Sequence, residues 1–280
     1  MKGKICIVTG GNTGIGKATV EGLARQGATV ILACRDLDKG RAAQAEIVAK
    51  LPGAEIELMR LDLASLASVR EFAKAFTEKH PRLDVLVENA GVSTGKRQLT
   101  ADGFEMDFGV NHLGHFLLTE LLLPTLEASS PSRVVVVASS VHKGAKIDFD
   151  DLQGEKSWGI VRFYGQSKLC NMLFVRSLAK RLEGKGVVVN ALHPGVIATE
   201  LARDFPAPLR WMAKLFFKSA EQGARTSIHV ATSKEAGDVS GKYFADSKEA
   251  KPSPEALDDA VAERLWTESE RLIAKASASA

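Results

Sequence analysis

With 280 residues, 45% of them hydrophobic, the chain can bury a sizeable core, and we expect one domain over residues 1–275. Its 37 basic and 34 acidic residues are spread along the chain, and a net charge of only +3 argues against nucleic-acid binding. Three widely spaced cysteines (Cys6, Cys34 and Cys170) indicate buried thiols rather than disulfides. With no apolar run of roughly 18 residues and no room for a signal peptide before the first strand, we expect a cytoplasmic protein without an integral membrane segment.

Short β-branched runs alternate with segments that carry apolar residues at helical spacing. The predicted strands are 4–8, 29–33, 56–61, 85–87, 134–138, 187–192 and 242–245. The predicted helices include 15–25, 39–50, 65–79, 101–126 and 164–182. This alternation predicts an α/β fold, a doubly wound, Rossmann-type parallel sheet of about seven strands with helices on both faces.

Two insertions, 143–163 and 199–219, interrupt the alternation after predicted strands. Both are therefore expected at the carboxyl edge of the sheet, where doubly wound folds bind ligands. The second contains a short predicted helix at about 209–217 with an apolar face. The sequence leaves three interpretations of it open: a substrate lid, a subunit interface, or a membrane contact. The Ala/Ser-rich tail, 276–280, is expected to be frayed.

A glycine-rich loop, "TGGNTGIG" at 9–16, follows the first predicted strand. Such a loop before a helix lets backbone N–H groups approach a phosphate. Gly11 to Lys17 also fits the G-x-x-x-x-G-K loop of nucleotide triphosphatases, but Ala18 stands where a Ser or Thr would bind Mg²⁺. A dinucleotide pyrophosphate is therefore the favoured ligand of this loop.

A tyrosine and a lysine lie four residues apart in "YGQSK", at the start of a predicted helix, so Tyr164 and Lys168 share one helix face. An ammonium beside a phenol favours the phenolate and lowers the tyrosine pKa from about 10 towards neutrality, as a general acid and base requires. Ser139 and Ser140 end the strand 134–138, and Asn111 follows a helical stretch. These groups are predicted to meet at one edge of the sheet.

Taken in order, these motifs resemble the short-chain dehydrogenase/reductases, over about 4–272. The pattern of the loop is T-G-x-x-x-G-I-G, "ENAG" at 88–91 stands for the family's "NNAG", and P-G-x-x-x-T begins at Pro194. The resemblance implies a catalytic tetrad of Asn111, Ser140, Tyr164 and Lys168. Stretches such as "NHLGHFLLTELLLP" are similar to the retinol-dehydrogenase-like branch. Glu88 departs from the family, because an asparagine usually stands there.

The cofactor is predicted to be NADP(H) rather than NAD(H). In "ACRD" the residue that would face the ribose is Cys34, with Arg35 beside it, whereas Asp36 comes too late for an NAD-type contact. A guanidinium can bind the extra phosphate. With the family's contacts added, the implied cofactor-binding residues are Gly10, Asn12, Thr13, Gly14, Ile15, Gly16, Arg35, Asp62, Leu63, Asn89, Ala90, Gly91, Tyr164, Lys168, Pro194, Gly195 and Thr199.

The expected activity is hydride transfer between NADP(H) and an apolar aldehyde or ketone, or the corresponding alcohol. The alternative is a protein that binds NADP(H) as a sensor or scaffold with little turnover, although such relatives usually lose the tyrosine or lysine. No metal site is predicted, since His112 and His115 have no matching carboxylate or cysteine. The wide apolar stripe of 116–127 indicates a possible homodimer or homotetramer, and a monomer that buries this stripe is the alternative.

Overall fold

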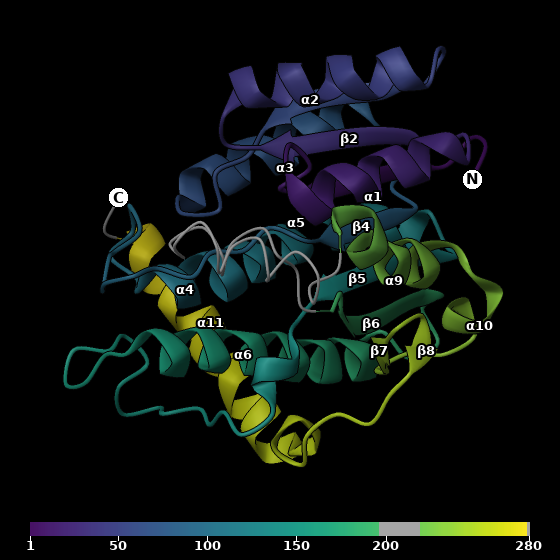
Figure 1. Cartoon of the computed structure of the whole chain (residues 1–280). Coiled ribbons are helices and arrows are strands. Elements are labelled where there is room, and N and C mark those ends of the chain that lie inside the picture. Colours follow the sequence, from purple (N-terminus) through teal and green to yellow (C-terminus); the bar gives the residue numbers. More distant parts are fainter. Residues whose placement is uncertain (196–218, 279–280) are drawn as a thin grey trace, which may run out of the picture.

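A single eight-stranded sheet forms the centre of the computed structural model, which describes residues 1–195 and 219–278 (Figure 1). The strand order is β3-β2-β1-β4-β5-β6-β7-β8, and all neighbours are parallel except β7 and β8. The strands are β1 (Ile5–Thr9), β2 (Thr29–Cys34), β3 (Ile56–Arg60), β4 (Val85–Glu88), β5 (Ser132–Val137), β6 (Val187–His193), β7 (Tyr243–Ala245) and β8 (Lys248–Glu249). The doubly wound α/β fold is confirmed, and a two-residue edge strand adds to the predicted seven.

Helices cover both faces of this sheet (Figure 1). One face carries α1 (Gly14–Arg25), α2 (Leu37–Lys50) and α9 (Ala220–Thr232). The other carries α3 (Leu66–Lys79), α5 (Gly114–Ala128) and α6 (Ile160–Arg181), with α11 (Asp259–Ala278) packed outside against α6. The short elements are α4 (Met106–Phe108), the π-helix η1 (Gly109–Leu113), the 3₁₀-helices η2 (Ser140–His142) and η3 (Glu255–Leu257), and α10 (Lys234–Gly237).

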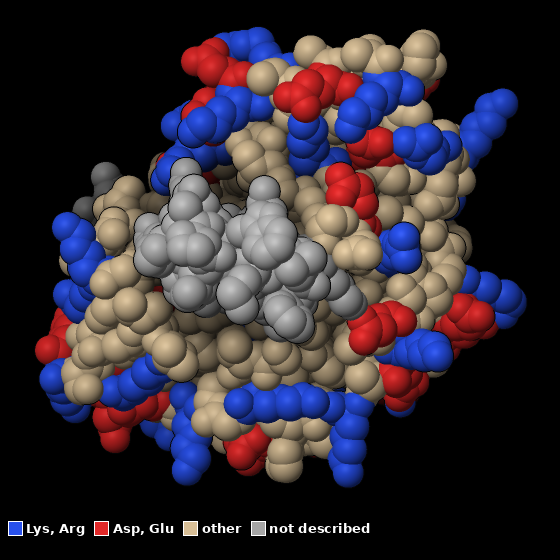
Figure 2. Space-filling view, viewed as in Figure 1, with Lys and Arg blue, Asp and Glu red and all other residues tan. Residues whose placement is uncertain are grey.

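The central strands are apolar on both sides because both faces are covered. In β1, Ile7 faces the core under α3, α5 and α6, whereas Cys6 and Val8 face the core under α1 and α2. This is the period-two alternation of a strand, with neither side meeting water. All three cysteines are buried and free. On the face seen in Figure 2, acidic and basic side chains are mixed.

Several predicted boundaries are wrong. The helix expected from Ala101 begins only at Met106, because the Glu105 carboxylate accepts a hydrogen bond from the Phe108 N–H and caps the helix there. It then passes through the π-helix η1 before α5. Conversely, α6 starts at Ile160, one turn before Tyr164. The last helix, α11, extends to Ala278, where the described part of the tail ends.

Buried polar groups both shape the insertion 143–163 and tie it to the body of the protein. Within the insertion, the Asp151 carboxylate accepts backbone hydrogen bonds from Glu155, Lys156 and Ser157. Trp158 Nε1 donates to Glu105 Oε1 over 3.1 Å. The other insertion, 199–219, with its predicted 209–217 helix, lies outside the described residues except for its last residue. Within the described ranges, no helix is both long and apolar enough to cross a membrane.

The C-terminal helix α11 covers part of the apolar stripe that suggested a subunit interface. Trp266 packs edge-on against Phe116 of α5, with ring centroids 4.7 Å apart, and stacks on Phe174 of α6. The Arg181 guanidinium lies over the indole, with its Cζ 4.0 Å from the ring centroid. The stripe is therefore partly buried within the chain itself.

Candidate active site

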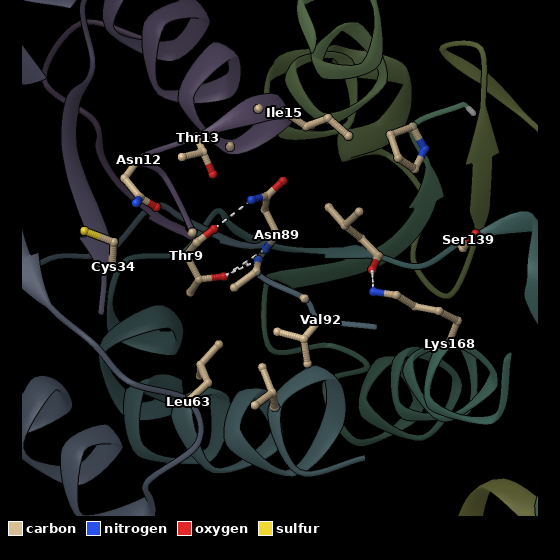
Figure 3. A pocket seen from close by; sticks show the side chains of 18 of the residues that line it. Thr9, Asn12, Thr13, Ile15, Cys34, Leu63, Asn89, Val92, Ser139 and Lys168 are labelled. Carbon is tan, nitrogen blue, oxygen red and sulfur yellow. Dashed lines mark hydrogen bonds between the residues drawn. The ribbon is translucent and has the colours of Figure 1, made fainter. Parts of the chain in front are cut away.

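A cavity of about 720 Å³ runs along the carboxyl ends of the parallel strands (Figure 3). It crosses the point between β1 and β4 at which the strand order reverses, which is where doubly wound sheets bind ligands. Residues that follow six strands line it, including Gly10 after β1, Arg35 after β2 and Asn89 after β4. Ser140 after β5 and Pro194 after β6 close the other end.

The glycine loop forms the floor of one end of the cavity. Gly14 has a φ of +51°, in the left-handed region that favours glycine. At Gly16, a Cβ atom would lie 2.2 Å from the Gly10 carbonyl oxygen, so no side chain fits. Helix α1 begins here without a side-chain cap from Thr13, which leaves N–H groups of its first turn available to an anion.

A second wall is fixed by the Thr9 hydroxyl at the end of β1 (Figure 3). Thr9 Oγ1 accepts hydrogen bonds from the N–H groups of Asn89 and Ala90, each over 2.9 Å. The Asn89 amide donates back to the Thr9 carbonyl over 2.8 Å. The turn after β4 is thus tied to the strand that carries the glycine loop.

Tyr164, Lys168 and Ser140 meet at the opposite end of the cavity. Lys168 Nζ lies 5.8 Å from the centroid of the Tyr164 ring and donates to the Val137 carbonyl over 3.0 Å. The Ser140 N–H donates to Nδ1 of His193, which also lines the cavity. The predicted tyrosine, lysine and serine therefore share one site.

Asn111 lies behind this group and does not line the cavity. It is fully buried in η1, where its Oδ1 accepts from the Val92 N–H over 2.7 Å and its Nδ2 donates to the Val92 carbonyl over 2.9 Å. Nδ2 also donates to Ser167 Oγ over 2.9 Å, which ties η1 to α6. A Cβ atom on Gly91 would lie 3.3 Å from both Asn111 Oδ1 and Lys168 Nζ, so these two polar atoms flank the same glycine.

Two buried carboxyl groups lie near Lys168. Burial raises the pKa of Glu88 to about 8, while a hydrogen bond from Thr119 and the charge of Lys168 oppose the rise. Burial and repulsion from Glu105 raise the pKa of Asp107 to about 7. One oxygen of each carboxyl has no hydrogen-bond partner within the part of the chain that the structure describes. The residue that departs from the family pattern is thus an acid kept largely neutral at pH 7.

The end of β2 offers two cations to the cavity. Arg35 and Lys39 line it. Asp36 also lines it, but its Oδ1 accepts from the N–H groups of Asp38 and Lys39 and caps α2. The same carboxylate pairs with Lys39 Nζ over 3.0 Å. Asp36 is therefore engaged in holding the helix.

Every predicted cofactor-binding residue within the described ranges lines the cavity; Thr199 lies outside them. Sequence reasoning missed Thr9 and His193. Each is the last residue of a strand, beside a glycine or proline motif, and that position could have drawn attention to both. It also missed the apolar wall of Val92, Met106 and Val110.

The sequence matches the family described as short chain dehydrogenase over residues 4–209. The chain belongs to this family. It is 49% identical to human retinol dehydrogenase 13 over 97% of this chain and 85% of that protein. It is 46% identical to human retinol dehydrogenase 14 over 98% of this chain and 87% of that protein. The resemblance to the retinol-dehydrogenase-like branch is confirmed.

Solved structures agree with the fold of this short-chain dehydrogenase. An uncharacterised protein from Mycobacterium paratuberculosis superposes with a TM-score of 0.80 at 35% identity, covering 97% of this chain and 94% of that one. Pseudomonas aeruginosa RhlG, solved as an NADP active-site complex, gives a TM-score of 0.72 at 28% identity, covering 87% of this chain and 94% of that one.

Proposed function

We propose that this short-chain dehydrogenase transfers hydride between NADP(H) and an apolar aldehyde or ketone, or the corresponding alcohol, with Tyr164 as general acid and base. One observation carries the proposal. A single cavity holds the glycine loop and Arg35 at one end and Tyr164, Lys168 and Ser140 at the other. A dinucleotide is a ligand long enough to join two such ends.

The residues at the loop end fit a dinucleotide. Gly16 leaves no space for a side chain where the backbone must approach a pyrophosphate, and the uncapped start of α1 provides N–H donors for its charge. Thr9 fixes the backbone of Asn89 and Ala90 as a wall of the same end. When bound, the nicotinamide supplies or accepts the hydride.

The chain's own groups would handle the proton and the oxygen of the substrate. In the reducing direction, the hydroxyls of Ser140 and Tyr164 donate hydrogen bonds to the carbonyl oxygen, and Tyr164 delivers its proton. The nearby ammonium of Lys168 favours the phenolate that remains. Asn111, the fourth member of the family tetrad, fixes the backbone at Val92 behind Lys168.

Two features support NADP(H) over NAD(H). Arg35 and Lys39 bring positive charge to the end of β2, where an additional phosphate would lie. Asp36, the acidic side chain nearest the expected ribose, is engaged as the cap of α2. RhlG, a relative of this fold, was solved with NADP.

An apolar substrate is supported by apolar side chains in the cavity wall. Val92, Met106, Val110 and Val141 line the cavity. Mostly apolar walls with a few polar groups are typical of sites for apolar small molecules. Relatives at 46–49% identity are named retinol dehydrogenases, so retinol and retinal are candidate substrates.

The deciding experiment follows NADPH oxidation at 340 nm with aliphatic and aromatic aldehydes, simple ketones and retinal. Tyr164→Phe should lower kcat by roughly a thousandfold while NADPH affinity, measured by fluorescence titration, stays within about twofold. A variant with normal turnover would exclude Tyr164 as the acid and base. Tight NADPH binding without turnover on any substrate would favour the sensor or scaffold instead.

A cytoplasmic location and a homodimer or homotetramer remain predictions. Light scattering of the purified protein measures the second directly. Because α11 covers part of the apolar stripe on α5, any assembly through that stripe must either use its remaining surface or displace Trp266.

A further inference from the structure

A buried hydrogen bond joins the C-terminal helix to the segment that carries Asn111. His112, the next residue in η1, has its Nε2 2.8 Å from Oγ of Ser269 on α11, 157 positions later in the sequence. His112 is 2% exposed and Ser269 is fully buried. Neither takes part in the proposed chemistry, so the contact requires another explanation.

The direction of this hydrogen bond follows from the proton count. The Ser269 hydroxyl donates to the Leu265 carbonyl of its own helix over 2.8 Å. Its one proton is then used, so Nε2 of His112 carries a hydrogen and donates to Ser269 Oγ. Burial lowers the pKa of His112 to about 3, so the ring is neutral in the working range of pH.

Aromatic rings surround the remaining sides of the imidazole. Phe108, Phe116 and Phe174 lie with their ring centroids 5.4, 6.0 and 6.2 Å from that of His112. Trp266, one turn before Ser269, packs on two of these rings. Removing the Ser269 hydroxyl would leave a buried N–H donor facing aromatic carbon, which is costly.

The segment that this contact holds is an unusual one. The π-helix η1 has wider turns than an α-helix and persists where tertiary contacts support it. Gly114, which follows η1, packs so closely on the cavity wall that a Cβ atom would lie 2.6 Å from the Leu63 carbonyl oxygen. Asn111 fastens the middle of η1 to Val92 and Ser167. His112 fastens it to α11 on the side away from the cavity.

We propose that α11 is a positioning element for the active site, in which the Ser269 hydroxyl, acting through His112, fixes the π-helix that presents Asn111. Ser269 is a positioning residue and does not touch the substrate. The inference rests on the proposed function only in assigning Asn111 a part in turnover; the hold of α11 on η1 is independent of it.

The kinetic test compares two serines of the same helix. Ser269→Ala removes the acceptor for His112, whereas Ser277→Ala removes a serine that makes the same bond to its own helix and otherwise contacts Arg70. We expect Ser269→Ala to lower kcat about tenfold, since a small displacement of a catalytic group is costly, with the KM for NADPH unchanged within twofold. Ser277→Ala should equal the wild type, and Ser269→Thr, which keeps the hydroxyl, should recover most of kcat.

A double-mutant cycle separates positioning from general damage. If Ser269 acts through η1 and Asn111, Ser269→Ala should lower kcat little further once Asn111→Ala is present. An equal loss of kcat in both backgrounds would overturn the proposal. Should Ser269→Ala fail to fold, Ser269→Cys, which keeps a weak acceptor, takes its place with a smaller loss expected.

Hydrogen exchange tests the hold on η1 without any turnover. Amides of 109–115 should exchange at least about fivefold faster in Ser269→Ala than in Ser277→Ala, while those of the glycine loop, 9–16, stay unchanged. Equal exchange in the two variants would overturn the proposal. Absence of wild-type turnover on every substrate would contradict the proposed function alone, and the exchange rates would still decide this inference.

Discussion

The two ends of the cavity are held by different kinds of contact. The glycine loop is shaped largely by local backbone contacts: Gly14 adopts a positive φ, and Gly16 packs on Gly10 six residues earlier. Asn111 is instead fastened to Val92, 19 residues away, and to Ser167, 56 residues away. Its neighbour His112 reaches Ser269 near the C-terminus.

This difference indicates which substitutions should impair each end of the cavity. The glycine loop depends largely on contacts among its own eight residues, with Thr9 adding hydrogen bonds to the turn after β4, so a change in the loop should damage cofactor binding and leave distant packing intact. The catalytic end depends on strands and helices from the whole chain, so changes far from the substrate should alter turnover. Substitutions at each end test this difference.

The largest effect in the loop is expected for Gly16→Ala. Its Cβ would lie 2.2 Å from the Gly10 carbonyl oxygen and 2.5 Å from Asn89 Nδ2, so the loop must shift. Overpacking of this kind costs about 1–3 kcal/mol, which predicts a rise in the Kd for NADPH of up to roughly a hundredfold. Gly95→Ala, where a Cβ meets nothing within 4 Å, is the matched control. Unchanged NADPH affinity in Gly16→Ala would mean that the loop does not hold the pyrophosphate.

Arg35→Ala should weaken NADPH binding roughly tenfold or more while leaving NADH binding unchanged. Hydrogen bonds from charged groups contribute about 1.5–3 kcal/mol, and only NADPH has the phosphate that Arg35 would bind. The control is Arg41→Ala, since Arg41 pairs with Asp38 and does not line the cavity. Titration with both cofactors measures the ratio. An equal loss for both would show that Arg35 does not select between them.

The same difference between local and long-range contacts determined which features could be predicted from the sequence. The loop, the strands before and after it and the Tyr164–Lys168 pair are local patterns, and the structure brings all of them to one cavity. Helical spacing could not show that Glu105 would cap the helix and move its start from Ala101 to Met106. Nor did it predict a π-helix, since its wider turns depend on tertiary support.

Contacts between residues far apart in the sequence were also not predicted. Thr9 looks like an ordinary strand residue, and its two bonds to the turn after β4 arise only when β1 and β4 become neighbours. The apolar stripe 116–127 was visible, but periodicity does not identify what covers a stripe. In the structure, Trp266, on a helix that was not among those predicted, covers part of it.

Buried carboxyl groups lie near Lys168 at the catalytic end. Glu88→Gln tests how much the burial of one of them lowers the free energy of unfolding. The pKa of Glu88 is raised from 4.5 to about 8, so the unfolded chain ionises this group at lower pH than the folded protein does. The stability contributed by the neutral form is therefore complete below about pH 4.5 and is lost as the pH rises to about 8. Glu88→Gln should match the wild type near pH 4.5 and exceed it by at least about 1–2 kcal/mol, and up to about 4 kcal/mol, at pH 8.

Urea unfolding at the two pH values measures this difference. Glu78→Gln, on the exposed side of α3, should show little difference between them, because among the residues that the structure describes Glu78 forms only a long surface pair with Lys74. A stability gain for Glu88→Gln that does not depend on pH would show that Glu88 is already ionised in the folded protein. The residue would then be a charged partner of Lys168 rather than a neutral one.

The smallest expected effect concerns the apolar rim of the catalytic end. Val141, which follows Ser140, lines the cavity and is 39% exposed. Val141→Asn should raise the KM for long apolar aldehydes about threefold and leave short ones unchanged, since covering a few tens of Å² of apolar surface contributes well under 1 kcal/mol. Leu257→Asn, an exposed apolar residue of η3 outside this cavity, is the control. If long and short aldehydes respond alike, the apolar tail of the substrate must instead lie along the inner wall formed by Val92, Met106 and Val110, and selectivity would then depend on the same π-helix region that α11 supports.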